Sequence, residues 1–305
     1  MGCNSANTQS AEPASDKEAD MSKAQGAKST AQSNVMTPKL AFDKEASMVT
    51  MTVPGIPGLQ CDVYCYEDNF GKAADGVMDG NDLVLTHKDP KLEGVVATTR
   101  FVPSPGGVDQ IVTVTGPNEA AVRSVTAMNP CIQFMKSSAF GRQQDWRSDY
   151  VSDFVSRCFV YLETGFTPLN KTKRVPGTIT ETYEHSNKTN SENPWIQEYY
   201  PVWRKHPGQE KGERGYSTDR PVYPIIGVVS YDGRHMAAIA WPETNRLGQV
   251  WMYCIHPRPG VGESYDRAAN KIVSRGKYYF IPYDPAGLLV AFHKDFPNWK
   301  MPEKR

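Results

Sequence analysis

The feature that most constrains the fold of this chain is a pair of apolar runs joined by a short polar turn near residue 232. The segment reads PIIGVVSYDGRHMAAIAW over residues 224–241. Asp232-Gly233 is a dipeptide that suits a type I′ turn, so the segment predicts a β-hairpin closed by that turn. The continuous apolar stretches are typical of strands that are covered on both faces.

Most of the remaining chain repeats this pattern of strands and turns. VVATTRFV and VDQIVTVTG flank a Pro-Ser-Pro-Gly-Gly turn and predict a second hairpin over 95–116. RCFVYLE, QVWMYCIH and GKYYFIP are expected to be further strands. One helix start stands out, because Asp284-Pro285 offers an N-cap and a first-turn proline before AGLLVAFHKDF. We therefore predict an all-β chain, a large antiparallel β-sandwich with one short C-terminal helix.

The beginning of the chain has the composition of a tether. It is rich in Ser, Ala, Gln and Lys and has no aromatic residue before Phe42. Such a segment buries too little apolar surface to offset its ordering entropy. We expect residues 1–45 to be a disordered tether and residues 46–305 to form one β-sandwich domain.

The first three residues suggest where the protein resides. Gly2-Cys3 resembles the end of a bacterial lipoprotein signal without its apolar region, with Cys3 as the lipid-bearing residue. This predicts an extracytoplasmic protein, in the periplasm or at the cell surface, that meets a membrane only through a lipid anchor. The alternative is a cytosolic protein with a disordered tail. Five other cysteines contain no CxxC pair, and Cys158 and Cys254 lie in apolar runs typical of small core residues.

Charge and missing motifs exclude several function classes. The 34 basic and 34 acidic residues give no electrostatic reason to expect nucleic acid as a partner. HExxH, GxSxG and Walker A motifs are absent. GVGESY, beginning at Gly260, starts like a dinucleotide-binding loop but lacks the third glycine. Protease, nucleotidase and dehydrogenase functions are therefore disfavoured, and no cofactor is required.

Two long polar segments, residues 182–220 and 256–275, are expected to be functional loops. The first contains NPWIQEYYPVWRKH, in which aromatic rings lie close to Arg and His donors. Flat rings stack on the CH faces of sugars while polar groups bind their hydroxyls. A polysaccharide or oligosaccharide is therefore the expected partner.

Part of the chain resembles a known fold family. The run QVWMYCIHPRPGVGESYDRAANKIVSRGKYYFIP is similar to the closing strands of the supersandwich fold of galactose-mutarotase-like domains and several polysaccharide lyases. NPCIQFMKSSAF, SRCFVYLETGF and GVVSYDGRHMAAIAW also resemble a bacterial extracytoplasmic family of unknown activity. The resemblance covers most of residues 60–297 and consists of strands and turns. It implies a supersandwich fold rather than a particular reaction.

The leading functional hypothesis is a lyase that cleaves uronate-containing glycans by β-elimination. Such an enzyme must neutralise the carboxylate, remove the neighbouring proton and protonate the leaving oxygen. Arg, His and Tyr supply these functions. The candidate catalytic residues are Tyr200, His206, Arg220 and His256. The candidate substrate-binding residues are Trp146, Trp195, Tyr199, Trp203, Arg204 and Asn129.

Several alternatives stay open. The same aromatic residues would serve a non-catalytic carbohydrate-binding lipoprotein or a structural, protein-interaction domain, and each of them is equally suited to packing the loop. His235 and His256 would face each other if their strands were adjacent. DGVMDGNDL offers oxygen ligands for calcium, although its spacing misses the EF-hand loop: Asp75, Asp79, Asn81 and Asp82. A hydrolase would need two opposed carboxylates, and the candidates are Glu181, Glu184, Glu198, Asp219 and Glu243.

Overall fold

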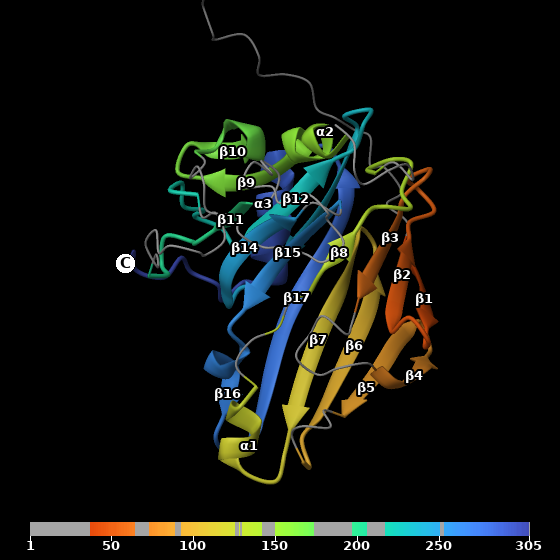
Figure 1. Cartoon of the computed structure of the whole chain (residues 1–305), viewed down its shortest axis with the longest axis vertical. Coiled ribbons are helices and arrows are strands. Elements are labelled where there is room, and N and C mark those ends of the chain that lie inside the picture. Colours follow the sequence, from red (N-terminus) through yellow and green to blue (C-terminus); the bar gives the residue numbers. More distant parts are fainter. Residues whose placement is uncertain are drawn as a thin grey trace, which may run out of the picture. The chain divides into compact units, whose positions relative to one another are not determined.

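The computed structural model describes residues 37–64, 73–88, 93–125, 128, 130–141, 150–173, 197–205, 217–250 and 253–304. The chain divides into two units, Met1–Asn34 and Val35–Arg305, and the described residues belong to the second. That unit is built mainly from antiparallel strands (Figure 1). No helix among the described residues is long and apolar enough to cross a membrane.

The first sheet has seven antiparallel strands in the order β1-β2-β3-β8-β15-β14-β11. Their bounds are β1 Lys39–Asp43, β2 Met48–Thr52, β3 Gln60–Tyr64, β8 Ile132–Gln133, β11 Gln197–Tyr199, β14 Thr244–Val250 and β15 Cys254–Pro259. Because β8 joins β3 to β15, this sheet combines the beginning of the described chain with a hairpin from near its end.

The second sheet has ten strands. Nine follow the order β10-β9-β12-β13-β17-β7-β6-β5-β4, and β16 pairs with β17. Their bounds are β4 Ala73–Asp79, β5 Asp82–Lys88, β6 Val96–Ser104, β7 Gly107–Thr115, β9 Cys158–Leu162, β10 Gly165–Pro168, β12 Ile225–Val229, β13 His235–Ala240, β16 Tyr265–Asp266 and β17 Lys271–Pro282. Both predicted hairpins are confirmed, as β12–β13 and β6–β7.

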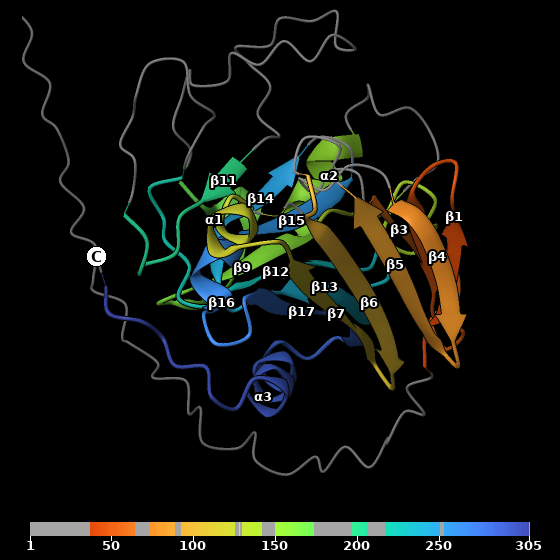
Figure 2. The same cartoon turned by 90° about the horizontal axis from the view of Figure 1, so that it is seen from below.

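The main core lies between the two sheets. Val49 from the first sheet and Ile239 from the second are fully buried in one apolar cluster. The alternate residues of β13 face the other way, and Ala238 packs in a second cluster with Phe292 of helix α3 (Pro285–Asp295). Helix α3 therefore covers the outer side of the ten-stranded sheet (Figure 2). Cover on both faces explains the continuous apolar runs of β12 and β13.

Helices are few and short. The predicted C-terminal helix is confirmed, and the Asp284 side chain caps it by accepting a hydrogen bond from the Gly287 N–H at 2.8 Å. The sequence did not predict the other helical elements: α1 Glu119–Arg123, α2 Tyr150–Arg157, η2 Leu169–Lys171 and η3 Val261–Ser264. Helix α1 has a recognisable start, since Asn118 accepts a hydrogen bond from the Ala121 N–H at 2.9 Å.

The predicted type I′ turn is wrong. Among the described residues, Gly233 is the member of the Asp232-Gly233 pair with positive φ, at 70°. The Gly233 N–H donates to the Ser230 carbonyl at 3.0 Å, and the Ser230 N–H donates to the His235 carbonyl at 2.9 Å. A type I′ turn needs two positive φ angles, whereas a turn followed by one left-handed residue belongs to the longer hairpin loops.

Two predictions about the segment after Gln249 are also wrong. QVWMYCIH is not one strand, because β14 ends at Val250 and the chain reverses into β15 at Cys254, after Tyr253 with φ 52°. Residues 256–275 are not a long loop, because they contain the end of β15, η3, β16 and the start of β17. A positive φ at a tyrosine is uncommon, which is why the residue types gave no turn signal.

The seven-stranded sheet begins before residue 46, where the β-sandwich domain was expected to start. Strand β1 pairs with β2 through a full register from Lys39 to Asp43. Its Leu40 and Phe42 pack against the core at alternate positions, which is enough apolar contact to hold an edge strand. The expected core positions of Cys158 and Cys254 are confirmed, because both are fully buried.

Candidate functional site

The outer face of the seven-stranded sheet is polar where β8, β15, β14 and β11 meet. The inward residues of these strands form the core, with Ile132 paired to Ile255 and both fully buried. Because strand side chains alternate between faces, their neighbours point outward. His256 lies one residue beyond Ile255, and its register partner is Gly248. We use the term outer face for the side of the seven-stranded sheet that carries His256 and the other polar residues of these strands.

Three strands bring an acid and an imidazole to either side of one glycine on the outer face. Glu198 of β11 pairs with Gly248 of β14, which pairs with His256 of β15. A Cβ atom added to Gly248 would lie 3.6 Å from Glu198 Cγ and 3.6 Å from His256 Nε2. Glycine in the middle of a strand is unfavourable and often marks a close approach by another group. Here a Cβ atom would be in ordinary van der Waals contact with both side chains, so Glu198 and His256 flank the glycine closely.

Two arginines form the next row of the outer face. Arg246 and Arg258 are register partners on β14 and β15. Arg246 Nη1 lies 2.8 Å from Glu198 Oε2, and Arg258 Nε lies 3.2 Å from Glu198 Oε1. The glutamate side chain is fully buried, whereas the arginine side chains keep 24% and 21% of their surface exposed. The triad carries one net positive charge, and its cationic members are the ones that reach solvent.

The polar side chains of this face continue from β15 across β8 to β3. Asp62 lies on this face and is 3% exposed. It accepts a hydrogen bond from Thr50 Oγ1 at 2.7 Å and pairs with Lys136 Nζ at 3.0 Å. The buried carboxylate is therefore compensated, as a buried charge requires. Gln133, which pairs with Asp62, is also buried.

Of the residues predicted to be catalytic, His256 and Tyr200 belong to this region. His256 lies within β15 rather than at a strand end, and it is 3% exposed. Tyr200 follows β11 directly and is half-buried. Tyr200 comes directly after Tyr199, which pairs with Leu247 of β14.

Arg220 has a structural task. Its guanidinium donates to the Pro201 carbonyl at 2.8 Å, to the Tyr200 carbonyl at 3.4 Å and to the Arg204 carbonyl. These bonds fix the chain that follows β11. Burial lowers the pKa of Arg220 below its usual value.

The predicted substrate-binding residues that are described lie away from the outer face. Tyr199 is fully buried, and its hydroxyl is 2.8 Å from Thr172 Oγ1. Trp203 is 4% exposed and packs edge-on against Trp299, with ring centroids 6.0 Å apart. Arg204 forms a two-pronged ion pair with Glu263 and donates to the carbonyls of Glu243 and Thr244. These contacts match the loop-packing alternative for the aromatic residues.

Other candidates fall outside the described residues: Cys3, Asn129, Trp146, Glu181, Glu184, Trp195 and His206.

The proposed pairing of His235 with His256 is wrong, because β13 and β15 belong to different sheets. Arg246, Gly248 and Arg258 were missed. The alternation R-x-G and H-x-R within two strands was the available signal, since it puts these residues on one face.

The acidic residues considered as calcium ligands form ion pairs with basic side chains. Asp79 and Asp82 pair with Arg100, and Asp75 pairs with Lys44. Among the residues that the structure describes, no three His, Cys, Asp or Glu side chains lie together as a metal site.

Glu243 is a partly buried carboxyl group near the end of the β14–β15 hairpin. Its oxygens accept hydrogen bonds from Ser264 Oγ at 3.2 Å and Ser274 Oγ at 3.3 Å. Burial raises the pKa of Glu243 above its usual value, in spite of these bonds.

Comparisons with known proteins show weak likenesses. No family model and no curated protein matches the chain. Among solved structures, alpha-N-acetylgalactosaminidase NagBb from Bifidobacterium bifidum in complex with GalNAc is similar with a TM-score of 0.45 and 11% identity. The match covers 85% of this chain and 37% of NagBb, so this chain spans little more than a third of that protein. Slr1438 from Synechocystis sp. PCC 6803 gives a TM-score of 0.30 at 9% identity, over 81% of this chain and 96% of Slr1438. Likenesses this distant carry no argument about function.

Proposed function

We propose that this protein acts on an acidic polysaccharide at the outer face and cleaves it by β-elimination beside a uronate. The observation that carries the proposal is that Arg246, Arg258 and His256 lie beside Gly248 on one face of two paired strands. Together with Tyr200, these residues supply the three groups that the reaction needs, which are a cation for the carboxylate, a base and an acid.

Each group has a defined task in this proposal. Arg246 and Arg258 hold the uronate carboxylate and stabilise the negative charge that develops on it. His256 accepts the proton from the carbon next to the carboxylate. The electron pair of that C–H bond forms the new C=C bond, and the bond to the glycosidic oxygen breaks. Tyr200 donates a proton to the leaving oxygen, so the products are an unsaturated uronate and a new chain end.

Glu198 is a positioning residue in this scheme. Its two oxygens each contact one arginine, which holds the two guanidiniums in a fixed relation. Glu198 supplies one negative charge to the two guanidiniums, so these three groups sum to one positive charge. That charge acts near buried groups, where electrostatic interactions are stronger than in water.

A second function, binding without turnover, is favoured by one observation. His256 is 3% exposed and Glu198 is fully buried, while the two arginines reach the surface. A surface that offers cations to solvent but covers its base is suited to holding an acidic glycan.

The test is the ultraviolet absorbance of unsaturated uronates during incubation with a panel of uronate-containing polysaccharides. The wild-type chain is expected to produce a rise with at least one substrate, and His256→Ala is expected to abolish it. His235→Ala is the matched control, because His235 lies half-buried on the other sheet. A rise that persists in His256→Ala contradicts the proposal. A flat trace for the wild type with retained polysaccharide binding selects the second function.

A further inference from the structure

A cavity of about 540 Å³ lies where the β14–β15 hairpin meets α1 and β16. Its walls carry the side chains of Arg123, Asn245, Glu263, Tyr265 and Arg267. The two glycines of the GVGESY segment contribute backbone. The volume is in the range of pockets that hold small organic ligands. None of these residues belongs to the reaction proposed for the outer face.

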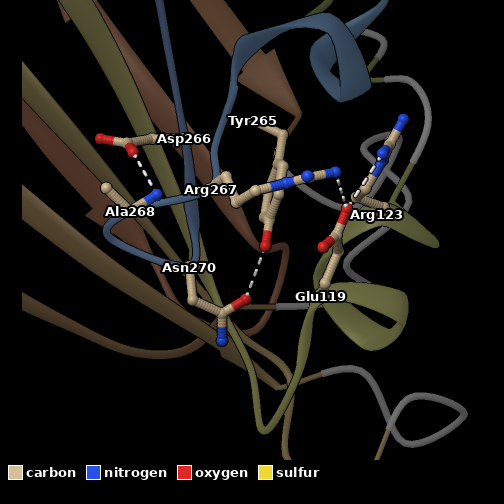
Figure 3. A network of polar contacts seen from close by, with 7 residues as sticks. All are labelled: Glu119, Arg123, Tyr265, Asp266, Arg267, Ala268 and Asn270. Carbon is tan, nitrogen blue, oxygen red and sulfur yellow. Dashed lines mark hydrogen bonds and ion pairs between the residues drawn. The ribbon is translucent and has the colours of Figure 1, made fainter.

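Two arginines of this cavity share one carboxylate oxygen. Arg123 Nη1 lies 3.1 Å and Arg267 Nη2 lies 3.3 Å from Glu119 Oε1, and Figure 3 shows both guanidiniums converging on that side chain. A guanidinium has five N–H donors, and each arginine uses one of its nitrogens on Glu119. The side chains of Arg123 and Arg267 are 54% and 81% exposed, so their other donors are accessible to a ligand.

Asn245 is turned toward the same space by a β-bulge. The β14–β15 register shifts between Thr244 and Arg246, which leaves Asn245 as the extra residue. Bulges re-aim side chains in this way. The Asn245 amide lies against Gly260, where an added Cβ would be 2.4 Å from Nδ2. Within the described part of the chain this amide has no hydrogen-bond partner, so it offers both a donor and an acceptor at the cavity wall.

The cavity also contains a fixed acceptor and an aromatic ring. Glu263 is held by the two-pronged contact with Arg204 and remains 59% exposed. The Tyr265 hydroxyl donates to Asn270 Oδ1 at 3.0 Å, and Arg123 lies 5.7 Å from the ring centroid (Figure 3). An inorganic anion needs donors alone. Donors, acceptors and a ring together are suited to a ligand with a carboxylate and hydroxyl groups.

We propose that this cavity binds a carboxylate-bearing saccharide, a single uronate unit. The carboxylate contacts Arg267 and Arg123, and the hydroxyls bond to Asn245 and Glu263. The site is separate from the outer-face residues, and its occupation does not depend on turnover there.

The experiment titrates the full chain with galacturonate, with galactose and with sulfate, followed by ligand-observed NMR and calorimetry. Galacturonate is expected to bind, and galactose to bind at least about tenfold more weakly, because a charge-assisted contact is worth about that factor or more. Arg267→Ala should weaken galacturonate binding by about tenfold, and Arg267→Lys should recover part of the loss. Arg234→Ala is the matched control, since Arg234 is an exposed arginine beside Asp232 in the β12–β13 turn.

Three results would overturn the proposal. The first is no galacturonate binding by the wild-type chain. The second is sulfate binding as tight as that of galacturonate, which would leave a general anion site. The third is a loss of galacturonate binding in Arg246→Ala that Arg267→Ala does not cause, which would move the site to the outer face. Because His256→Ala should bind galacturonate normally, failure of the elimination reaction and failure of this site are distinguishable.

Discussion

Replacing Glu198 by glutamine tests whether the outer face is built on a buried ion pair. The carboxylate is fully buried and lies 2.8 Å from Arg246 and 3.2 Å from Arg258. Glutamine keeps the shape but removes the charge, which leaves two like-charged guanidiniums beside a neutral amide. Removing one partner of a buried ion pair typically costs about 3–5 kcal/mol.

The expected effect lies at the lower end of that range. Both arginines keep about a fifth of their surface in water, so they recover part of the lost interaction by solvation. A loss of about 3 kcal/mol in a domain of this size corresponds to a fall in Tm of about 6 °C. The assay is a thermal melt followed by circular dichroism, with Glu163→Gln as the control. Glu163 pairs with Lys304 at the surface, where both side chains are mostly exposed, and its loss should leave Tm unchanged.

A triple variant separates stability from function. Glu198→Leu with Arg246→Met and Arg258→Met removes all three charges, and apolar replacement of a whole buried ionic group is often neutral or stabilising. We expect Tm to return to the wild-type value while binding of acidic polysaccharide is lost. Equal melts for Glu198→Gln and Glu163→Gln would refute the argument that the triad is a buried ionic group.

Two further predictions concern the ten-stranded sheet and the partly buried carboxyl group of Glu243. Gly276→Ala should lower the free energy of unfolding by about 1–3 kcal/mol, because an added Cβ would lie 2.1 Å from Trp241 Cε3 in a fully packed site; a thermal melt measures this. Glu243→Gln should stabilise the protein at neutral pH, because burial raises the pKa of Glu243 and the native state therefore loses stability as pH rises from the usual carboxyl pKa through the raised one. The Tm values of the wild-type protein and Glu243→Gln should converge at the acidic end of that pH window. A difference in Tm that stays constant with pH would contradict the reasoning.

Much of the fold could be predicted because its strongest signals are local. The β12–β13 and β6–β7 hairpins join strands that are neighbours in sequence, and α3 starts at a cap formed by Asp284. The break between β14 and β15 could not be predicted from residue types. Tyr253 has a positive φ there, a conformation that a residue with a bulky side chain rarely adopts.

The aromatic loop shows what residue types leave undecided. Tyr199 and Trp203 suit sugar stacking and core packing equally well. Trp203 is buried because Trp299, from beyond helix α3, packs against it, and no local pattern reports a contact between residues so far apart. The sequence indicated His256, but its neighbours Glu198 and Arg246 come from two other strands whose order in the sheet is a tertiary property.

The two proposed sites share one hairpin, and the bulge in it explains why they are distinct. Arg246 and Arg258 are register partners, and toward the open end of the hairpin they are followed by Asn245 on β14 and, after Pro259, by Gly260. At about 3.3 Å per residue, Gly260 is some 13 Å along the strand from His256. Without the bulge, strand alternation would put Asn245 on the face opposite Arg246 and into the packed side of the sheet. The extra residue instead turns its amide into the cavity. Strands β14 and β15 thus present two arginines on the outer face and, next to them, a cavity wall with both hydrogen-bond donors and acceptors. Successive sugar units of an acidic polysaccharide would need such an arrangement.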